Sequence, residues 1–210
     1  MEKILFIGIT GNFGTGKSTV CKIIEEYGYP VIYSDTLAKE LMAKNDELKK
    51  KIIENFGEEA YHEDGSLNRK WLAERVFSNS PESESTLARL NAIVHPFVLD
   101  ETEKIITRLI EEGNRLIFFE SALIFEANIQ NLFDYIILVD SKKEKIYERL
   151  EKLGKFSKIE IDSRLQKQIP AREKYNSADF IIQNNGTLEE LKKNVEFILD
   201  ILRELASNGR

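Results

Sequence analysis

A glycine-rich segment near the start of the chain has the composition and spacing of a phosphate-binding loop. It reads Gly-Asn-Phe-Gly-Thr-Gly-Lys-Ser and matches the pattern G-x-x-x-x-G-K-[ST] at every fixed position. Glycines let the backbone turn so that successive N–H groups point toward phosphate oxygens, and a helix that follows adds its positive end. The pattern predicts a nucleoside triphosphate site. Its expected members are Gly11, Asn12, Phe13, Gly14, Thr15, Gly16, Lys17, Ser18 and Thr19.

The three residues after the last glycine carry the polar groups that such a site needs. We expect Lys17 to bridge the β- and γ-phosphates, and Thr19 to reach the α-phosphate. Ser18 supplies a hydroxyl for Mg²⁺, which offsets phosphate charge and positions the γ-group for in-line transfer. A dinucleotide-binding fingerprint would require a glycine where Thr19 stands, so the spacing excludes that class.

The flanking elements have the order that this mechanism requires. The apolar run over 4–9 predicts a strand that is buried on both faces, and apolar residues at helical spacing over 17–27 predict a helix, in which Cys21 is a core residue. Further strands are predicted at the segments 31–33, 116–119, 135–139 and 179–182. Strands that alternate with helices indicate an α/β fold of three layers with a parallel sheet, whose ligands bind at the carboxyl ends of the strands.

Between these strands the segment 36–113 is charged and patterned as helix, which predicts a helical insertion. We expect it to be broken at Gly57, at the polar turn 63–66, and at Pro81 and Pro96. Two further helices are expected near the C-terminus. One opens with a capping box from Ser141 to Glu144, and the other runs from about Thr187 to Ala206.

Three acidic residues follow predicted strands and are candidates for chemistry beside the phosphates. Asp35 is the best candidate to orient or deprotonate an attacking hydroxyl, although a helix N-cap is its structural alternative. Glu120 and Asp140 are candidates to approach the metal through water. We favour Glu120, because the capping box already accounts for Asp140.

Cationic groups are also needed over the charge of a phosphoryl transition state. Arg149, Arg164 and Arg172 lie in the right part of the chain, although a single arginine is more often a solvated surface residue. His95, before Pro96, can contact an anionic substrate, but a lone histidine is more often structural.

Composition limits the class of protein. The 210 residues are 42% hydrophobic and 31% charged with a net charge of −6, which is typical of one globular domain and argues against nucleic acid as a partner. Cys21 is the single cysteine, so no internal disulfide forms and a cytoplasmic location is expected. No apolar run approaches the roughly 20 residues of a membrane span. We expect a monomer or a weak homo-oligomer.

The remaining sequence favours a small-molecule kinase. The guanine-reading string Asn-Lys-x-Asp is absent, and the chain is short for a mechanical ATPase. Two alternatives stay open. One is a kinase with another small acceptor, such as a nucleotide or shikimate, and the other is an ATP-binding regulator without acceptor chemistry.

Several strings, in order from Ile7 to about Gly186, resemble the dephospho-coenzyme A kinase family. The segment 8–19 resembles its opening GLTGGIGSGKST, and 34–39 resembles its D-A-D-x-x-A-R string, with Asp35 at the family's catalytic aspartate. The segments 64–69 and 90–96 resemble its substrate-side helices. Near the adenine site, Ala178-Asp179 and Asn184-Asn185-Gly186 resemble its A-D-x-x-I-x-N-N-G ending.

The resemblance implies transfer of the γ-phosphate of ATP, with Mg²⁺, to the ribose 3′-hydroxyl of dephospho-coenzyme A, the last step of coenzyme A synthesis. It implies a phosphate-loop NTPase fold in one domain, 1–210. The parts would be a nucleotide core (about 1–35, 114–145 and 178–210), a helical coenzyme-binding subdomain (about 36–113) and a helical lid (about 146–177). The implied catalytic residues are Asp35, Lys17 and Arg149, and the implied nucleotide-binding residues include Asn184, Asn185 and Gly186. The implied substrate-binding residues are Asp35, Lys39, Arg69, His95 and Glu120.

The chain departs from the family pattern at three places. Ala122 replaces a proline of the P-L-L-F-E string, and Lys39 replaces an arginine, which keeps the charge without the planar fork. Leu153-Gly154 replaces an Arg-Asp pair of the lid. The missing cation is then expected from Lys152 or Lys155.

Overall fold

The computed structural model describes residues 3–76, 83–154, 156–166 and 168–208. The chain divides into two compact units, which are described separately. The first consists of Met1–Tyr33 together with Arg108–Arg210, and the second is Ser34–Thr107. No helix in the described parts of the chain combines the length and the apolarity needed to cross a membrane.

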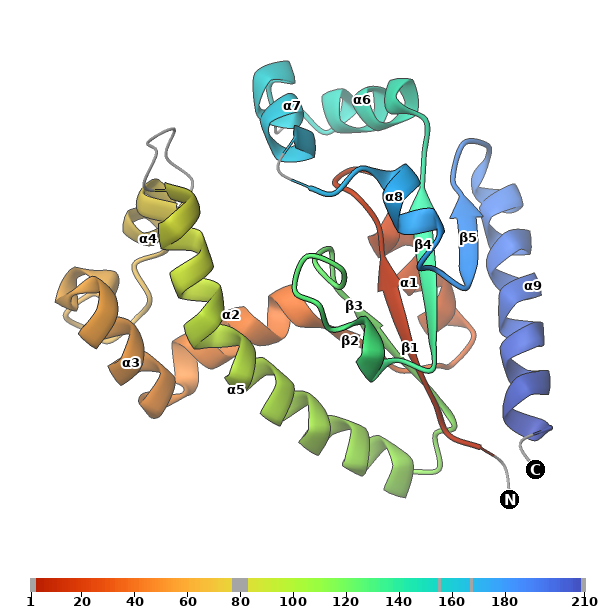
Figure 1. Cartoon of the computed structure of the whole chain (residues 1–210), viewed down its shortest axis with the longest axis horizontal. Coiled ribbons are helices and arrows are strands. Elements are labelled where there is room, and N and C mark those ends of the chain that lie inside the picture. The colour runs from red at the N-terminus through yellow and green to blue at the C-terminus, as the bar shows by residue number, and fades with distance from the viewer. Residues whose placement is uncertain (1–2, 77–82, 155, 167, 209–210) are drawn as a thin grey trace. The chain divides into compact units, whose positions relative to one another are not determined.

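A parallel sheet forms the centre of the first unit (Figure 1). Its five strands, counted over the described residues, are β1 (Leu5–Thr10), β2 (Val31–Tyr33), β3 (Leu116–Glu120), β4 (Tyr135–Asp140) and β5 (Phe180–Gln183). They lie in the order β2-β3-β1-β4-β5, and every neighbouring pair is parallel. The predicted α/β class and parallel sheet are confirmed.

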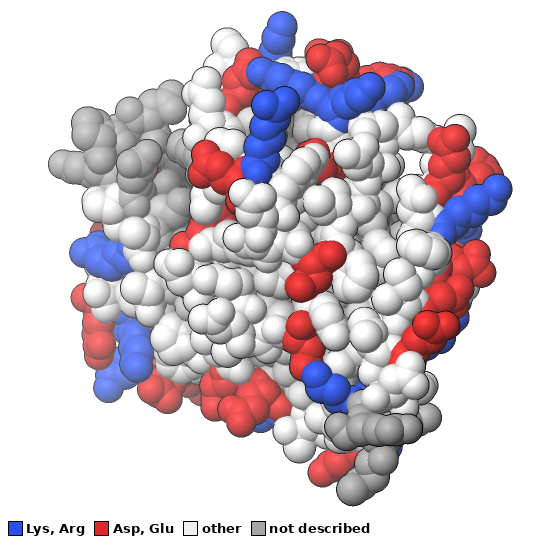
Figure 2. Space-filling model, turned by 45° about the vertical axis from the view of Figure 1, so that its right-hand side comes forward, with Lys and Arg blue, Asp and Glu red and all other residues white. Residues whose placement is uncertain are grey.

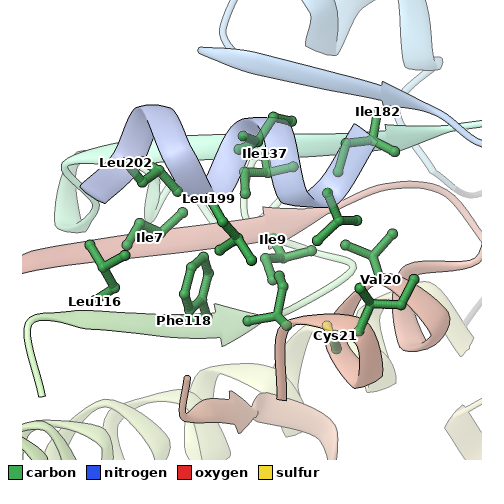
Figure 3. Close-up of a cluster of buried hydrophobic side chains, with 14 of the residues drawn as sticks. Ile7, Ile9, Val20, Cys21, Leu116, Phe118, Ile137, Ile182, Leu199 and Leu202 are labelled. Atoms are coloured by element: carbon green, nitrogen blue, oxygen red, sulfur yellow. The ribbon is translucent and has the colours of Figure 1, made fainter. Parts of the chain in front are cut away.

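Two helices, α1 (Lys17–Glu26) and α9 (Leu188–Ser207), pack against one another and against the sheet. Figure 3 shows their apolar side chains meeting those of the strands, with Leu199 and Leu202 of α9 near Ile7 and with Cys21 of α1 in the same cluster. The β1 strand is apolar from Leu5 to Ile9, as expected for a strand in the middle of a parallel sheet. The expected burial of Cys21 is confirmed, since its side chain is fully buried.

Side chains that point from β1 and β3 to another layer form an aromatic group. Phe6 contacts Phe119 and Phe133 at centroid distances of 6.0 and 4.9 Å. Ile124 packs so closely that a Cβ added to Gly8 would lie 2.9 Å from its side chain. The short helix α8 (Ala171–Tyr175) packs beside β4, and η2 (Gln130–Leu132) precedes that strand. Helices therefore lie on both sides of the sheet.

The helices α6 (Lys143–Lys152) and α7 (Lys158–Gln166) complete the first unit. The predicted capping box at Ser141 is wrong, because α6 begins after Lys142 and has no side-chain cap. The Ser141 hydroxyl instead donates to the Asn184 carbonyl at 2.7 Å and contacts Asn185 Oδ1 at 3.2 Å. The observed capping box belongs to α9, where Thr187 and Glu190 exchange both hydrogen bonds.

The second unit is helical in its described residues. Its elements are α2 (Ser34–Lys44), α3 (Asp46–Phe56), η1 (Glu58–Ala60), α4 (Arg69–Val76) and α5 (Ser83–Glu111), which continues into the first unit. Leu48, Ile52 and Leu72 lie in its own core. Gly57 ends α3 as expected.

Pro96 does not break a helix, contrary to the prediction, because it lies inside α5. Proline removes one N–H donor and one hydrogen bond of the helix ladder. Val94 and Val98, on either side of it, are buried in the core of the second unit. This packing holds the helical conformation through the proline. Pro81 lies outside the described residues.

Candidate functional site

The predicted phosphate loop connects the end of β1 to the start of α1. Gly11, Gly14 and Gly16 have φ angles of 152°, 79° and 97°, which side-chain-bearing residues rarely adopt. A Cβ at Gly11 would lie 2.2 Å from the Val139 carbonyl oxygen, and one at Gly16 would lie 2.2 Å from Asn184 Nδ2. The loop therefore needs glycine for its backbone shape and also for its close neighbours.

The Lys17 side chain lies along this loop. Its Nζ donates to the Gly11 carbonyl at 2.8 Å and to the Asn12 carbonyl at 3.4 Å. The same nitrogen is 4.0 Å from Glu120 Oε1, and the two side chains are only 11% and 13% exposed. Ser18 and Thr19 are exposed in the first turn of α1, where the helix dipole favours an anion.

The two acidic candidates at the strand ends have different surroundings in the structure. Glu120 ends β3 and pairs in register with Ile9 and Tyr33. Asp140 ends β4, and its carboxylate accepts a hydrogen bond from the Tyr175 hydroxyl. This bond raises the pKa of Tyr175 to about 12. Glu120 thus lies beside Lys17, whereas Asp140 is engaged by α8.

Arg149 joins α6 to the loop and to the turn after β5. Its guanidinium donates to the Asn184 carbonyl at 2.5 Å and to Asn184 Oδ1 at 3.0 Å. It also contacts Ser141 Oγ at 3.1 Å and the Thr15 carbonyl at 3.4 Å. Asn184 Nδ2 donates to the same Thr15 carbonyl at 2.9 Å. Three predicted site residues from distant parts of the sequence are therefore brought together.

The rest of the Asn-Asn-Gly turn is less buried. Asn185 Oδ1 accepts a hydrogen bond from the Lys142 backbone at 2.7 Å, and Gly186 is exposed. The turn is thereby tied to the start of α6. Its exposed end leaves backbone groups that a ligand can reach.

The other cations predicted for the lid have different surroundings. The Arg164 guanidinium lies 4.9 and 4.8 Å from the ring centroids of Phe13 and Phe156, in cation–π geometry. Arg172 is exposed on α8, and Lys152 pairs with Glu148 at 2.8 Å. Lys155 lies outside the described residues.

The surface of one side of the molecule shows how these charges are distributed. Figure 2 shows Lys and Arg side chains gathered along the upper edge, where Figure 1 places α6 and α7. The sequence of α6 contributes Lys143, Lys145, Arg149 and Lys152. The same helix carries Glu144, Glu148 and Glu151, and Lys145 and Lys152 both pair with Glu148, so basic and acidic side chains are mixed along it.

Four of the predicted site residues belong to the second unit. Asp35 and Lys39 are exposed on α2, with Asp35 in the first turn just beyond the end of β2. Arg69 is the exposed first residue of α4. His95 is partly buried in α5, and burial lowers its pKa below the ordinary 6.5.

The donor set at the loop fits a magnesium ion that arrives with phosphate. Among the described residues, no three His, Cys, Asp or Glu side chains are grouped closely enough to hold a metal by themselves. Mg²⁺ is usually bound by one or two protein oxygens, by substrate phosphates and by several waters. The exposed Ser18 hydroxyl and the nearby Glu120 carboxylate match this need.

Three contacts near the loop were not expected from the sequence. The Phe13 amide donates to Gln168 Oε1, Asn12 Nδ2 donates to the Ile169 carbonyl, and Lys174 pairs with Glu126. The partners are 155, 157 and 48 positions apart, so no local pattern joins them. The apolar and charge periodicities of the sequence contain no signal for such pairs.

Comparison with known proteins gives consistent matches. A family model described as dephospho-CoA kinase matches residues 5–190. A dephospho-CoA kinase of Salinibacter ruber is 38% identical over 187 residues, which cover 89% of this chain and 92% of that protein.

Two solved structures extend the likeness to the fold. A crystal structure from Thermus thermophilus has a TM-score of 0.79 and 31% identity, and the match covers 96% of this chain and 99% of that one. A dephospho-CoA kinase from Campylobacter jejuni has a TM-score of 0.68 and 25% identity, with 95% and 97% covered.

Proposed function

The chain belongs to the dephospho-CoA kinase family, and from this we propose that it transfers the γ-phosphoryl group of ATP to the ribose 3′-hydroxyl of dephospho-CoA. The observation that carries the proposal is the glycine loop of 11–18 with Lys17 lying along it and Glu120 beside Lys17. This arrangement suits a triphosphate, whose β- and γ-oxygens would take the place of the carbonyl groups that Lys17 now contacts.

On the donor side, the backbone N–H groups of the loop and the start of α1 bind the phosphates. Lys17 spans the β- and γ-phosphates, and Thr19 reaches the α-phosphate. Mg²⁺, when bound with ATP, neutralises phosphate charge and orients the γ-group. Ser18 would hold it directly and Glu120 through water. The Asn184-Asn185-Gly186 turn contributes to the adenine site.

On the acceptor side, Asp35 orients the 3′-hydroxyl and takes its proton as the hydroxyl oxygen bonds to the γ-phosphorus of ATP. The bond from that phosphorus to the β,γ-bridging oxygen breaks, and ADP leaves with the electron pair. Lys39, Arg69 and His95 contact the acceptor from the second unit, which corresponds to the proposed coenzyme-binding subdomain. The segment that contains α6 and α7 acts as the lid. Closing it excludes water, which is itself a competing acceptor for the phosphoryl group.

A panel of hydroxyl acceptors tests the proposal. Purified protein is supplied with Mg²⁺ and ATP together with dephospho-CoA, a nucleoside monophosphate or shikimate, and the phosphorylated product is measured. Transfer to dephospho-CoA is expected to exceed the others by orders of magnitude. Transfer to another acceptor alone would favour a different small-molecule kinase, and slow hydrolysis with no transfer would favour an ATP-binding regulator.

Replacing Arg149 with alanine is expected to lower kcat by about 10- to 100-fold and to leave the KM for dephospho-CoA nearly unchanged. The guanidinium would be lost from Thr15 and Asn184, and with it a cation near the transferring phosphate. Steady-state kinetics measures both constants. Arg108→Ala, at an exposed arginine of α5 that is not a candidate site residue, is the control, and an Arg149→Ala variant with the same kcat as this control would leave Arg149 a purely structural role.

A further inference from the structure

A buried ion pair lies behind the phosphate loop. Lys174 of α8 has a fully buried side chain, and its Nζ is 2.8 Å from Oε1 of Glu126, whose side chain is 17% exposed. The second carboxylate oxygen, Glu126 Oε2, is buried and accepts no hydrogen bond within the described residues. Glu126 comes from the segment that follows β3, so the pair joins that segment to α8.

The same carboxylate holds a short piece of backbone against the loop. Glu126 Oε1 also accepts a hydrogen bond from the Ile169 N–H at 3.2 Å. On the other side of this piece, the Ile169 carbonyl accepts from Asn12 Nδ2 at 3.2 Å and Gln168 Oε1 accepts from the Phe13 N–H at 2.7 Å. We call residues 168–169 the bridge, since they bond to Glu126 on one side and to the loop on the other.

We propose that Gln168, Glu126 and Lys174 are positioning residues that hold the first half of the phosphate loop in its phosphate-binding shape. Asn12 and Phe13 directly precede Gly14, and the bridge fixes one backbone group and one side chain of this pair. A loop whose N–H groups are already aimed at the phosphates does not have to be ordered when ATP binds. Gln168 holds the loop through the Phe13 N–H, and the Glu126–Lys174 pair holds the bridge through the Ile169 N–H.

The energetics of the buried Lys174–Glu126 pair favour a role in positioning its neighbours over a role in stabilising the fold. A buried ion pair gains little net stability over an apolar pair of the same volume, because both charges lose their hydration. It does fix the positions of its partners, since a displaced carboxylate would leave the Lys174 ammonium buried without a counter-charge.

The test uses Gln168→Met and Glu126→Gln in the full chain. Methionine matches the length of glutamine but replaces its amide oxygen with a thioether, which is only a weak acceptor for the Phe13 N–H. The matched control is Glu26→Gln, because Glu26 also pairs with a lysine across two elements, at 2.9 Å to Lys192, but on the surface. Calorimetry gives the Kd of Mg·ATP, and an NMR spectrum gives the chemical shift of the Phe13 amide. Kinetics gives the KM values for both substrates.

Gln168→Met is expected to raise the Kd of Mg·ATP about tenfold and to shift the Phe13 amide, with little change in the KM for dephospho-CoA. Glu126→Gln is expected to raise the Kd of Mg·ATP and to shift the Phe13 amide in the same direction as Gln168→Met does. The double variant should be less impaired than the product of the two single effects, because both substitutions act on one chain of contacts. The control should match the unmodified protein.

The proposal is overturned if Gln168→Met changes the Kd of Mg·ATP and the Phe13 amide shift no more than the control variant does. It is also overturned if the Kd of the double variant rises by the full product of the two single-variant effects. Should Glu126→Gln fail to fold, Gln168→Met decides by itself, since it removes no charge. The inference rests on the proposed function only where KM values are measured, because these require transfer to dephospho-CoA. An unmodified protein that binds ATP but transfers nothing to dephospho-CoA would overturn the function, while the Kd and the Phe13 shift would still decide the role of the bridge.

Discussion

Replacing Asp35 with asparagine is expected to lower phosphoryl transfer to dephospho-CoA by roughly 100-fold or more, while ATP still binds with unchanged affinity. Asparagine has nearly the same shape as aspartate but cannot accept the proton of the attacking hydroxyl. The side chain is exposed in the first turn of α2, so the substitution removes no packing. Single-turnover transfer and calorimetric binding of Mg·ATP measure the two quantities.

Asp46→Asn is the matched control for this change. Asp46 is likewise an exposed aspartate in the first turn of a helix of the second unit, where its charge favours the helix N-terminus. The control variant should transfer phosphate at the normal rate. If both variants were equally active, Asp35 would be only a helix-terminal residue, and the proposed catalytic role would be rejected.

A Gly16→Ala variant is expected to lose affinity for Mg·ATP by about 100-fold or more. The added methyl would lie 2.2 Å from Asn184 Nδ2, and this amide is buried and bonded to the Thr15 carbonyl. Either the loop or the Asn184 turn must therefore shift, and the N–H groups of the loop would no longer converge on the phosphates. Calorimetry with Mg·ATP measures the loss.

Gly28→Ala separates this collision from backbone strain. Gly28 has a φ of 86°, close to the 97° of Gly16, but a Cβ there would meet nothing within 4 Å. Both variants carry a strain of about 1–2 kcal/mol from a left-handed backbone. Only Gly16→Ala should lose nucleotide binding. Equal loss in the two variants would mean that strain alone, and not contact with Asn184, explains the effect.

The elements that the sequence predicted well are those specified by local composition. Continuous apolar runs such as 4–9 and 135–139 predict strands wherever they occur in a parallel sheet, because both faces are buried. The composition and spacing of the glycine loop predict its position equally well. The errors occurred where distant contacts decide the structure. Ser141 has the spacing of a cap, but its hydroxyl finds Asn184 across 43 positions, and Pro96 is held within α5 by core packing.

The same division applies to the site. Position at the end of a strand identified both Glu120 and Asp140 as acidic candidates. Only the fold shows that Tyr175 bonds to Asp140 while Glu120 lies 4.0 Å from Lys17. The bridge could not be predicted, because its partners come from separate segments whose spacing is set by the sheet. The catalytic and binding roles of the site residues stay predictions that the variants above examine.

The burial of Cys21 has a practical consequence for spectroscopy. Its side chain points from α1 into the core and is fully buried, and burial raises the pKa of the thiol, so little of the reactive thiolate forms at neutral pH. The sequence contains no second cysteine. A cysteine introduced at Ile159, which is 81% exposed on α7, would therefore react with a maleimide dye while the native thiol stays unlabelled. Fluorophores can thus be attached at chosen surface positions without first removing a residue of the core.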